Sequence, residues 1–244
     1  MASFRADIHI HSLLSPCGDI EMTPLAIVRR AKEQGLDIIG ITDHNATLQC
    51  EEVHRIGQRE GVYVLCGAEI TTQEEVHCLV FVEQGAPLVA LQAYIEKHLP
   101  PIRNNPDLFG YQLVVNEQEE VLYEAPYLLI SALSQSIDQV EAEAHRLGGL
   151  FIPAHIDKPK NSLFSQLGFV PPGLKADALE IFRNTEMADF RQAHPELNAK
   201  GGLQSAPYPL VCSSDAHYPN EIGRRYISLD MDSLHFDAIK KAIV

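Results

Sequence analysis

Five short apolar runs in this chain each lead into residues that can bind divalent metals. The first and last lead into Asp7-Ile8-His9-Ile10-His11 and Ser213-Ser214-Asp215-Ala216-His217. The others lead into Thr42-Asp43-His44, Gly67-Ala68-Glu69 and Pro153-Ala154-His155. Imidazole and carboxylate groups bind borderline divalent ions, and an α/β fold places its chemistry at the ends of parallel strands. The recurrence predicts a metallohydrolase built around a cluster of metal ions.

Helical and strand-like segments alternate along most of the chain, which is typical of βαβ units and a parallel sheet. Thr23 and Pro24 are a cap and a first residue for the first helix. The predicted strands are Arg5–Ile10, Leu36–Ile41, Val62–Cys66, Val76–Val82, Gly149–Pro153, Asp177–Phe182, Leu210–Ser213 and Tyr226–Leu229. The predicted helices are Pro24–Gln34, Leu48–Glu60, Leu88–His98, Ile137–Leu147 and Ser233–Ile243. The pattern predicts an α/β fold with about seven barrel-type strands.

Two segments interrupt the alternation. Leu113–Val115 and Glu120–Tyr123, joined by a polar turn, predict a hairpin insertion near residues 111–124. A proline-bearing loop follows at Lys158–Pro172, and both segments are expected to shape the mouth of a pocket. Neither an internal repeat nor a linker separates two domains, so residues 1–244 are predicted to form one domain.

Composition bears on location and partners. The chain has 33 acidic and 19 basic residues, a formal charge of −14, and no cluster of Lys and Arg. Such a surface repels phosphate backbones, so we expect a small phosphorylated metabolite as the partner and no long nucleic acid. Five cysteines without a CxxC pair indicate a reducing compartment. With no room for a signal peptide and no membrane-length apolar stretch, a soluble cytoplasmic protein is expected; the oligomeric state is left open.

The spacing of the polar residues suggests which of them share an ion. His9 and His11 alternate with apolar residues, so both can face the same side of a strand. Glu69 follows an apolar run, where a carboxylate is costly to bury without a cation, and His77 lies eight positions later. The alternatives are polar residues capping a strand end, an exposed glutamate and a histidine satisfied in the core. The other histidines, in helices or polar loops, are expected at the surface: His54, His98, His145, His194 and His235.

Taken together, His9-Ile10-His11-Ser12, Thr42-Asp43-His44-Asn45, Gly67-Ala68-Glu69 with His77, Pro153-Ala154-His155 and Ser214-Asp215-Ala216-His217 resemble the motifs of the PHP (polymerase and histidinol phosphatase) family, in family order. The resemblance covers nearly the whole chain. It implies a distorted (β/α)7 barrel, similar to a TIM barrel, with two to three divalent ions at the C-terminal ends of its strands. It also implies phosphoesterase activity.

Carried over motif by motif, the resemblance assigns ligands to three ions. His9, His11, Glu69 and Asp215 would hold the first ion, and Glu69, His77 and His155 the second. His44 and His217 would hold the third, for which a further ligand is expected at the position of Cys17. Cys17 is either a thiolate ligand, which favours zinc or iron over manganese, or a thiol beside a weak or empty site. Asp43 and Asp7 are expected to fix the tautomer of a ligand histidine or to cap a strand end.

The predicted reaction is hydrolysis of a small phosphate monoester by a hydroxide bridging two ions. Arg183, at the end of a predicted strand, is the first choice for a phosphate anchor, with Arg224 and Arg225 as second choices. Arg183 and Asp43 are thus the predicted catalytic residues, and Arg183 and Arg224 the substrate-binding ones. The alternatives are a nucleotide phosphodiesterase or exonuclease, and a non-catalytic module that binds metal for regulation. Sequence leaves the leaving group, the metal (zinc, manganese or iron) and the general acid open.

Overall fold

The computed structural model of the chain describes residues 1–182, 187–198 and 207–244. Its strands are β1 (Ala2–Ile10), β2 (Ile38–Ile41), β3 (Tyr63–Thr71), β4 (His77–Val82), β5 (Leu113–Val115), β6 (Val121–Glu124), β7 (Leu150–Pro153), β8 (Leu179–Glu180), β9 (Leu210–Val211) and β10 (Ile227–Met231). Its helices are α1 (Pro24–Glu33), α2 (Cys50–Glu60), α3 (Ala86–His98), α4 (Pro106–Phe109), α5 (Ile137–Arg146), α6 (Leu163–Gln166), α7 (Met187–Ala193) and α8 (Phe236–Ile243), with 3-10 turns η1 (Pro195–Asn198) and η2 (Pro219–Glu221). The predicted α/β class is confirmed.

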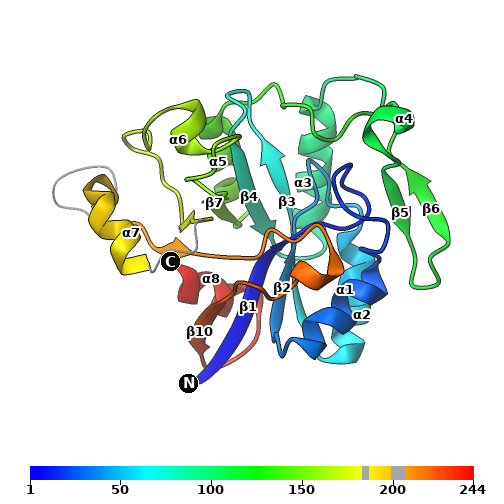
Figure 1. Cartoon of the computed structure of the whole chain (residues 1–244), viewed down its shortest axis with the longest axis horizontal. Helices are drawn as coiled ribbons and strands as arrows, with labels where there is room; N and C mark the ends of the chain where they lie inside the picture. The colour runs from blue at the N-terminus through cyan, green and yellow to red at the C-terminus, as the bar shows by residue number, and fades with distance from the viewer. Residues whose placement is uncertain (183–186, 199–206) are drawn as a thin grey trace.

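The main sheet is curled, in the order β10-β1-β2-β3-β4-β7 (Figure 1). Two backbone hydrogen bonds, Asp177 N–H to Phe151 O and Ile156 N–H to Glu180 O, continue it towards the parallel pair β8-β9. Beyond β9, a bridge between Ile10 and Ala216 returns the chain to β1. The curl therefore brings the end of β9 beside the end of β1, although the two segments lie about 200 positions apart.

Strand direction departs from the expected parallel pattern at β4. β1, β2 and β3 run parallel, whereas β4 runs antiparallel to both β3 and β7. An antiparallel strand brings its first residue, not its last, to the edge where its neighbours end. His77 opens β4 opposite Thr71 of β3 and therefore lies at the ligand-bearing edge.

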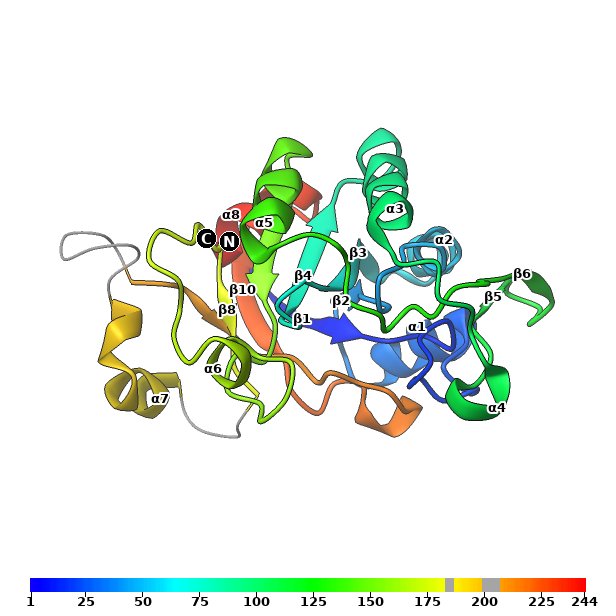
Figure 2. The same cartoon turned by 90° about the horizontal axis from the view of Figure 1, so that it is seen from above.

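An apolar cluster fills the inside of the curled sheet and supports that edge. Leu79 and Phe81 of β4 face this cluster, while Cys78 and Val80 face the helices outside, as strand alternation requires. α8 packs against the inner cluster through Ile239. On the outer side, α3 and α5 lie next to each other and α1 and α2 cover the first strands (Figure 2).

Several predicted boundaries need correction. β3 extends through Glu69 to Thr71, so Glu69 lies within a strand and not beyond its end. β8 and β9 are each two residues long, shorter than predicted. α1 begins at Pro24, with the Thr23 hydroxyl accepting a hydrogen bond from Ala26 N–H, as predicted. The hairpin β5-β6 lies within the range predicted for the insertion; the single-domain organisation stays a prediction. No helix in the described ranges is both long and apolar enough to cross a bilayer.

Candidate metal centre

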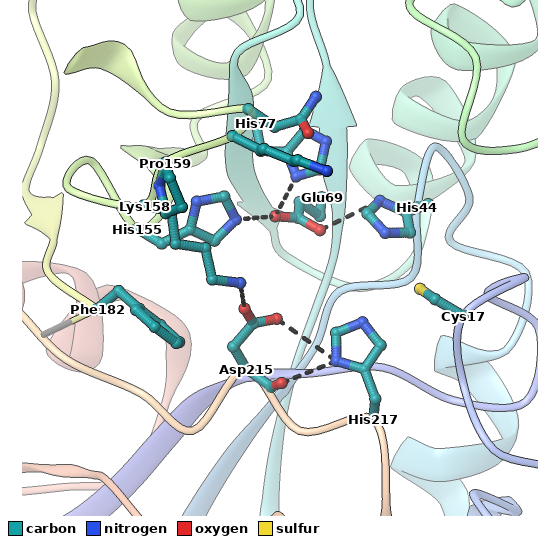
Figure 3. Close-up of a pocket in the computed structure, with 12 residues that line it drawn as sticks. Cys17, His44, Glu69, His77, His155, Lys158, Pro159, Phe182, Asp215 and His217 are labelled. Carbon is teal, nitrogen blue, oxygen red and sulfur yellow. Dashed lines mark hydrogen bonds and ion pairs between the residues drawn. The ribbon is translucent and has the colours of Figure 1, made fainter. Parts of the chain in front are cut away.

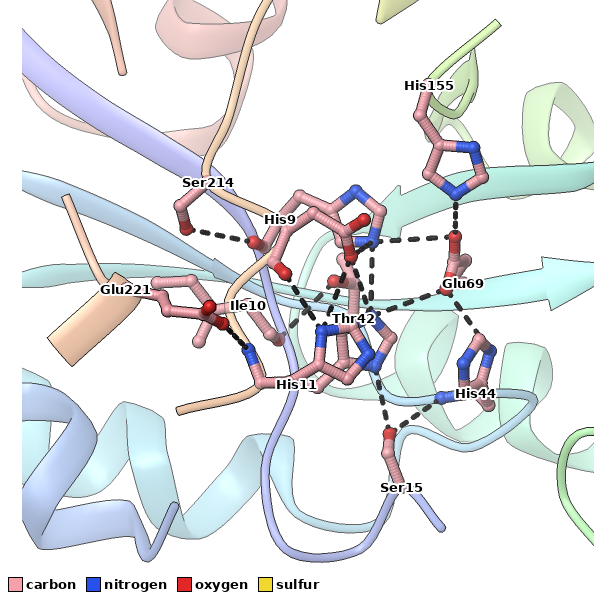
Figure 4. Close-up of polar contacts among 12 residues, drawn as sticks. His9, Ile10, His11, Ser15, Thr42, His44, Glu69, His155, Ser214 and Glu221 are labelled. Carbon is pink, nitrogen blue, oxygen red and sulfur yellow. Dashed lines mark hydrogen bonds and ion pairs between the residues drawn. The ribbon is translucent and has the colours of Figure 1, made fainter. Parts of the chain in front are cut away.

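The predicted ligand side chains converge at one edge of the curled sheet (Figures 3 and 4). His9 lies on β1 and His11 follows it, His44 comes after β2, and Glu69 lies on β3. His77 opens β4, His155 follows β7, and Asp215 and His217 follow β9. All of them except His77 and His217 are buried. The curl of the sheet thus gathers six segments of the chain around one point.

His9, His11 and Asp215 form the most buried donor group. The Nε2 atoms of His9 and His11 lie 3.2 Å apart, and Asp215 Oδ1 lies 3.3 Å from the first and 3.4 Å from the second. Oxygens of Glu69 approach the same two nitrogens at 3.5 and 3.3 Å. Donor atoms that share one ion at about 2.1 Å lie roughly 3.0–3.4 Å apart, so this group fits a divalent ion.

Glu69 connects this group to a second one. Its Oε1 atom lies 2.9 Å from both His77 Nδ1 and His155 Nε2, and its Oε2 atom lies 3.1 Å from His44 Nδ1 (Figure 3). His44 Nδ1 makes no well-aligned hydrogen bond despite this short approach. The carboxylate of Glu69 thus has imidazole nitrogens near each of its oxygens, and its role as a bridging ligand stays a prediction.

Two of these residues hold an unusual backbone conformation. His155 and Asp215 have φ values of 31° and 53°, in the left-handed region that non-glycine residues rarely adopt. Such strain persists only where the surrounding structure imposes it, and it clusters at functional sites. Here the backbone turns in the segments that follow β7 and β9, which directs the His155 side chain towards Glu69 and the Asp215 side chain towards His9.

Cys17 lies in a third group, with its sulfur near ring nitrogens of His11, His44 and His217. The turn that places it depends on Gly18, whose N–H donates to Ser15 O and whose position leaves a Cβ only 2.2 Å from Ser12 O. Any larger residue there would clash with backbone. The structure therefore brings Cys17 to the predicted third site, although whether its sulfur ligates an ion stays a prediction.

Two of the buried histidines, His9 and His11, have a hydrogen-bond partner on the ring nitrogen that faces away from the donor group. His9 Nδ1 lies 2.9 Å from Glu180 Oε2, and the same carboxylate oxygen accepts from His155 N–H at 2.9 Å. His11 Nδ1 lies 3.0 Å from Ser15 Oγ (Figure 4), and the Ser15 hydroxyl donates to Asp43. Partners of this kind fix the tautomer and the orientation of a ligand ring.

Sequence reasoning missed Glu180 and Ser15. Glu180 is a carboxylate inside the apolar run Ala178–Phe182, the same signal that singled out Glu69. Asp43 acts on His11 through Ser15 rather than directly. Asp7 does not hold a histidine; its carboxylate accepts from Ser214 N–H and Gly223 N–H and so positions the segment after β9. Burial raises the pKa of Asp7 to about 6.

Electrostatics divide the histidines into two kinds. Burial lowers the pKa of His9, but the carboxylates of Glu180, Asp215 and Glu69 outweigh it and raise that pKa well above its usual range. Burial lowers the pKa of His44 well below its usual range and that of His217 to about 4. The thiol of Cys17 behaves differently from the histidines. Although the residue as a whole is exposed, desolvation of its sulfur and the nearby Glu69 carboxylate raise the pKa of the thiol to about 12. A ligand must lose its proton, so if His9 or Cys17 ligates an ion, binding of that ion would be coupled to proton release.

A cavity of about 460 Å³ opens over these groups. It is lined by Cys17, His44, Glu69, His77, His155, Lys158, Pro159, Lys160, Asn161, Phe182, Asp215 and His217. Lys158 forms an ion pair with Asp215, and sequence reasoning gave it no role. Its pKa is raised, because Asp215 and other carboxylates outweigh the lowering effect of burial.

A family model for the PHP domain matches residues 7–153. The chain belongs to the PHP domain family. Among curated proteins, it is 26% identical over 272 residues to YqxK of Bacillus subtilis, covering 100% of this chain and 62% of that protein. The PHP chain thus spans less than two thirds of the length of this relative.

Solved structures share the PHP fold over nearly the whole chain. Endonuclease Q of Pyrococcus furiosus has a TM-score of 0.67 at 21% identity, covering 99% of this chain and 56% of that one. Endonuclease Q in complex with a 27-mer duplex carrying an abasic lesion has a TM-score of 0.68 at 22% identity, with the same coverage. A Bifidobacterium adolescentis protein described as a metal-dependent phosphoesterase has a TM-score of 0.62 at 18% identity, covering 97% and 94%. The predicted α/β fold with a curled sheet agrees with these neighbours, and the closed seven-stranded barrel stays a prediction.

The expectation that excluded long nucleic acids is wrong. Endonuclease Q has the same fold and was solved with a DNA duplex at its active site. Net charge failed as a criterion because it sums the whole surface, whereas binding depends on the potential at the site. Here the structure places Lys158 and Lys160 together at the cavity, which the sequence count of clustered cations did not reveal.

The predicted phosphate anchors have different outcomes. Arg183 lies outside the described residues of this PHP domain. Arg224 is exposed and pairs with Glu221 at 3.1 Å instead of lining the cavity. Arg225 donates to the carbonyl oxygens of Ile181 and Phe182, which ties the end of β8 to the segment after η2. Neither Arg224 nor Arg225 is therefore placed to contact a phosphate in the cavity.

Proposed function

We propose that this PHP domain is a metal-dependent phosphoesterase and that its substrate is a small phosphate monoester. The observation that carries the proposal is the convergence of donors around Glu69 and Asp215 at distances that suit shared divalent ions. A cavity of about 460 Å³ is within the size range of small-molecule sites. The ligands His9, His11, Glu69 and Asp215 would hold one ion and Glu69, His77 and His155 another.

When bound, such ions lower the pKa of water and neutralise charge on phosphoryl oxygens. The residues of the chain have separate tasks. Glu180 and Ser15 orient His9 and His11, so the donor atoms need little reorganisation on binding. The buried setting of Glu69 limits competition from water and strengthens its electrostatic interactions. No serine or cysteine nucleophile is required for hydrolysis of this kind.

A second candidate is cleavage of a phosphodiester in nucleic acid. It is favoured by the fold likeness to Endonuclease Q over 99% of the chain. A diester needs room for groups on both sides of phosphorus, and the cavity extends from Phe182 on one side to Cys17 on the other (Figure 3). A regulatory role without turnover is the remaining alternative from sequence.

One set of assays separates the three candidate functions: monoester hydrolysis, phosphodiester cleavage and regulation without turnover. Protein loaded with Mn²⁺ or Zn²⁺ is incubated with p-nitrophenyl phosphate, bis(p-nitrophenyl) phosphate and a DNA duplex with one abasic site. We expect release of p-nitrophenol from the monoester, lost when the ions are removed with a chelator and restored when they return. Cleavage of the diester or duplex with the monoester intact would favour the second candidate. Metal-loaded protein inactive on all three would contradict the proposal.

A further inference from the structure

Lys158 is a cation built into the cavity. Its ammonium pairs with the Oδ2 atom of Asp215 and lies 4.6 Å from the centre of the Phe182 ring (Figure 3). The side chain is 26% exposed, so one part of it is desolvated while the tip still reaches the cavity. Among described lining residues, the lysines and arginines are Lys158 and Lys160, and Lys160 is exposed.

The two oxygens of Asp215 face different partners. Oδ1 lies 3.3 Å from His9 Nε2 and 3.4 Å from His11 Nε2, whereas Oδ2 accepts from Lys158. One carboxylate thus connects the buried donor group to the lysine. An ammonium has three donors, and pairing with Asp215 leaves further N–H groups for another acceptor.

The loop that carries Lys158 is fixed at both ends to ligand residues. Lys158 N–H donates to His155 O at 2.9 Å, and His77 N–H donates to Asn161 O at 2.9 Å. Within the loop, the Ser162 hydroxyl donates to Lys158 O at 2.7 Å. Any shift of His77 or His155 therefore moves the loop with it, so the position of the lysine is coupled to that of the donors.

We propose that Lys158 binds a phosphoryl oxygen of the substrate and is oriented for this task by Asp215. The inference rests on the proposed phosphoesterase function and names the residue that recognises the anion. An ammonium held beside the donors can neutralise charge on an oxygen that the ions leave free.

The test measures binding of inorganic phosphate to Mn²⁺-loaded protein by calorimetry, alongside elemental analysis of each variant. Lys158→Met keeps the length of the side chain and removes its charge. We expect it to weaken phosphate binding about 10- to 100-fold, the usual range for loss of a hydrogen bond to a charged group, with ion content unchanged. Lys158→Arg should recover part of the affinity. Lys97→Met, at an exposed position on α3, should bind like the unaltered protein.

The outcomes separate the two proposals. If the unaltered protein binds phosphate and hydrolyses esters but Lys158→Met binds phosphate within threefold, the role of Lys158 is overturned and the function stands. Loss of ions in step with loss of phosphate binding would also overturn it, because Lys158 would then only support the ligands. A stronger effect of Lys160→Met would assign the contact to Lys160 instead. If the metal-loaded unaltered protein neither binds phosphate nor hydrolyses esters, both proposals fail.

Discussion

The metal centre has an inner and an outer group of donors that differ in burial and support. His9, His11 and Glu69, the inner group, are at most 1% exposed, and both histidines have a partner on the ring nitrogen facing away from the centre. Cys17 and His217, the outer group, line the cavity; Cys17 is exposed and His217 is half-buried. A desolvated, fully partnered donor cannot be replaced by water without leaving its partners unsatisfied. The difference predicts that the inner group determines whether ions bind and the outer group adjusts how many.

The largest effect is expected from His9→Ala. The change removes the imidazole whose Nε2 atom lies beside Asp215 in the donor group. It also leaves the buried Glu180 carboxylate without its imidazole partner. We expect loss of bound ions and a fall in monoester hydrolysis of roughly 1,000-fold or more, since metal ligands act as a unit. Elemental analysis and steady-state kinetics measure both quantities. His98→Ala, outside the cavity at the end of α3, is the matched control. If the His9→Ala protein were active and retained its ions, the proposed difference between the inner and outer donor groups would be wrong.

An intermediate effect is expected from Glu180→Gln. The change removes the negative charge that supports His9 but keeps the shape of the side chain. Loss of such a partner typically lowers metal affinity or activity about 10- to 100-fold. Competition with a chromophoric chelator measures the affinity. Glu143→Gln, which removes a carboxylate paired with Arg146 on α5, should leave it unchanged. Equal metal affinities in the two variants would mean that the contact between Glu180 and His9 Nδ1 does not affect metal binding.

The smallest effect is expected from Cys17→Ser. Cys17 lies at the cavity rim, so its replacement leaves the inner group intact. We expect at most one ion fewer per chain, a change in hydrolysis below about 10-fold, and a weaker preference for zinc over manganese because the soft sulfur is gone. Ion content after loading with each metal provides the measurement. Complete loss of ions would show that the outer group is as essential as the inner one.

Much of this centre could be predicted from the chain because most of the donors follow or end an apolar run, whereas His77 begins one. His9 and His11 lie at the end of a strand as predicted, whereas Glu69 lies within β3 rather than beyond it, and their roles as ligands stay predictions. β4 was harder: its run gives no sign of direction, and only pairing with β3 and β7 makes it antiparallel. The partnership of Glu180 with His9 was missed because the two residues lie 171 positions apart. Ser15 is only four positions from His11, but the turn that brings its hydroxyl to the ring is irregular and has no periodic signal in the sequence.

The sequence by itself determined which residue types could ligate ions and that strands would carry them, because periodicity and burial are local properties of the chain. Only the tertiary structure decided which donors meet. The curl of the sheet brings Asp215 beside His9, and one hydrogen-bonded loop brings Lys158 to the other oxygen of that carboxylate. These are contacts between distant segments, and their positions depend on the packing of the whole fold. The same holds for charge: Lys158 and Lys160 are neighbours in the sequence, but only the fold places them at the cavity of a chain whose net charge is −14.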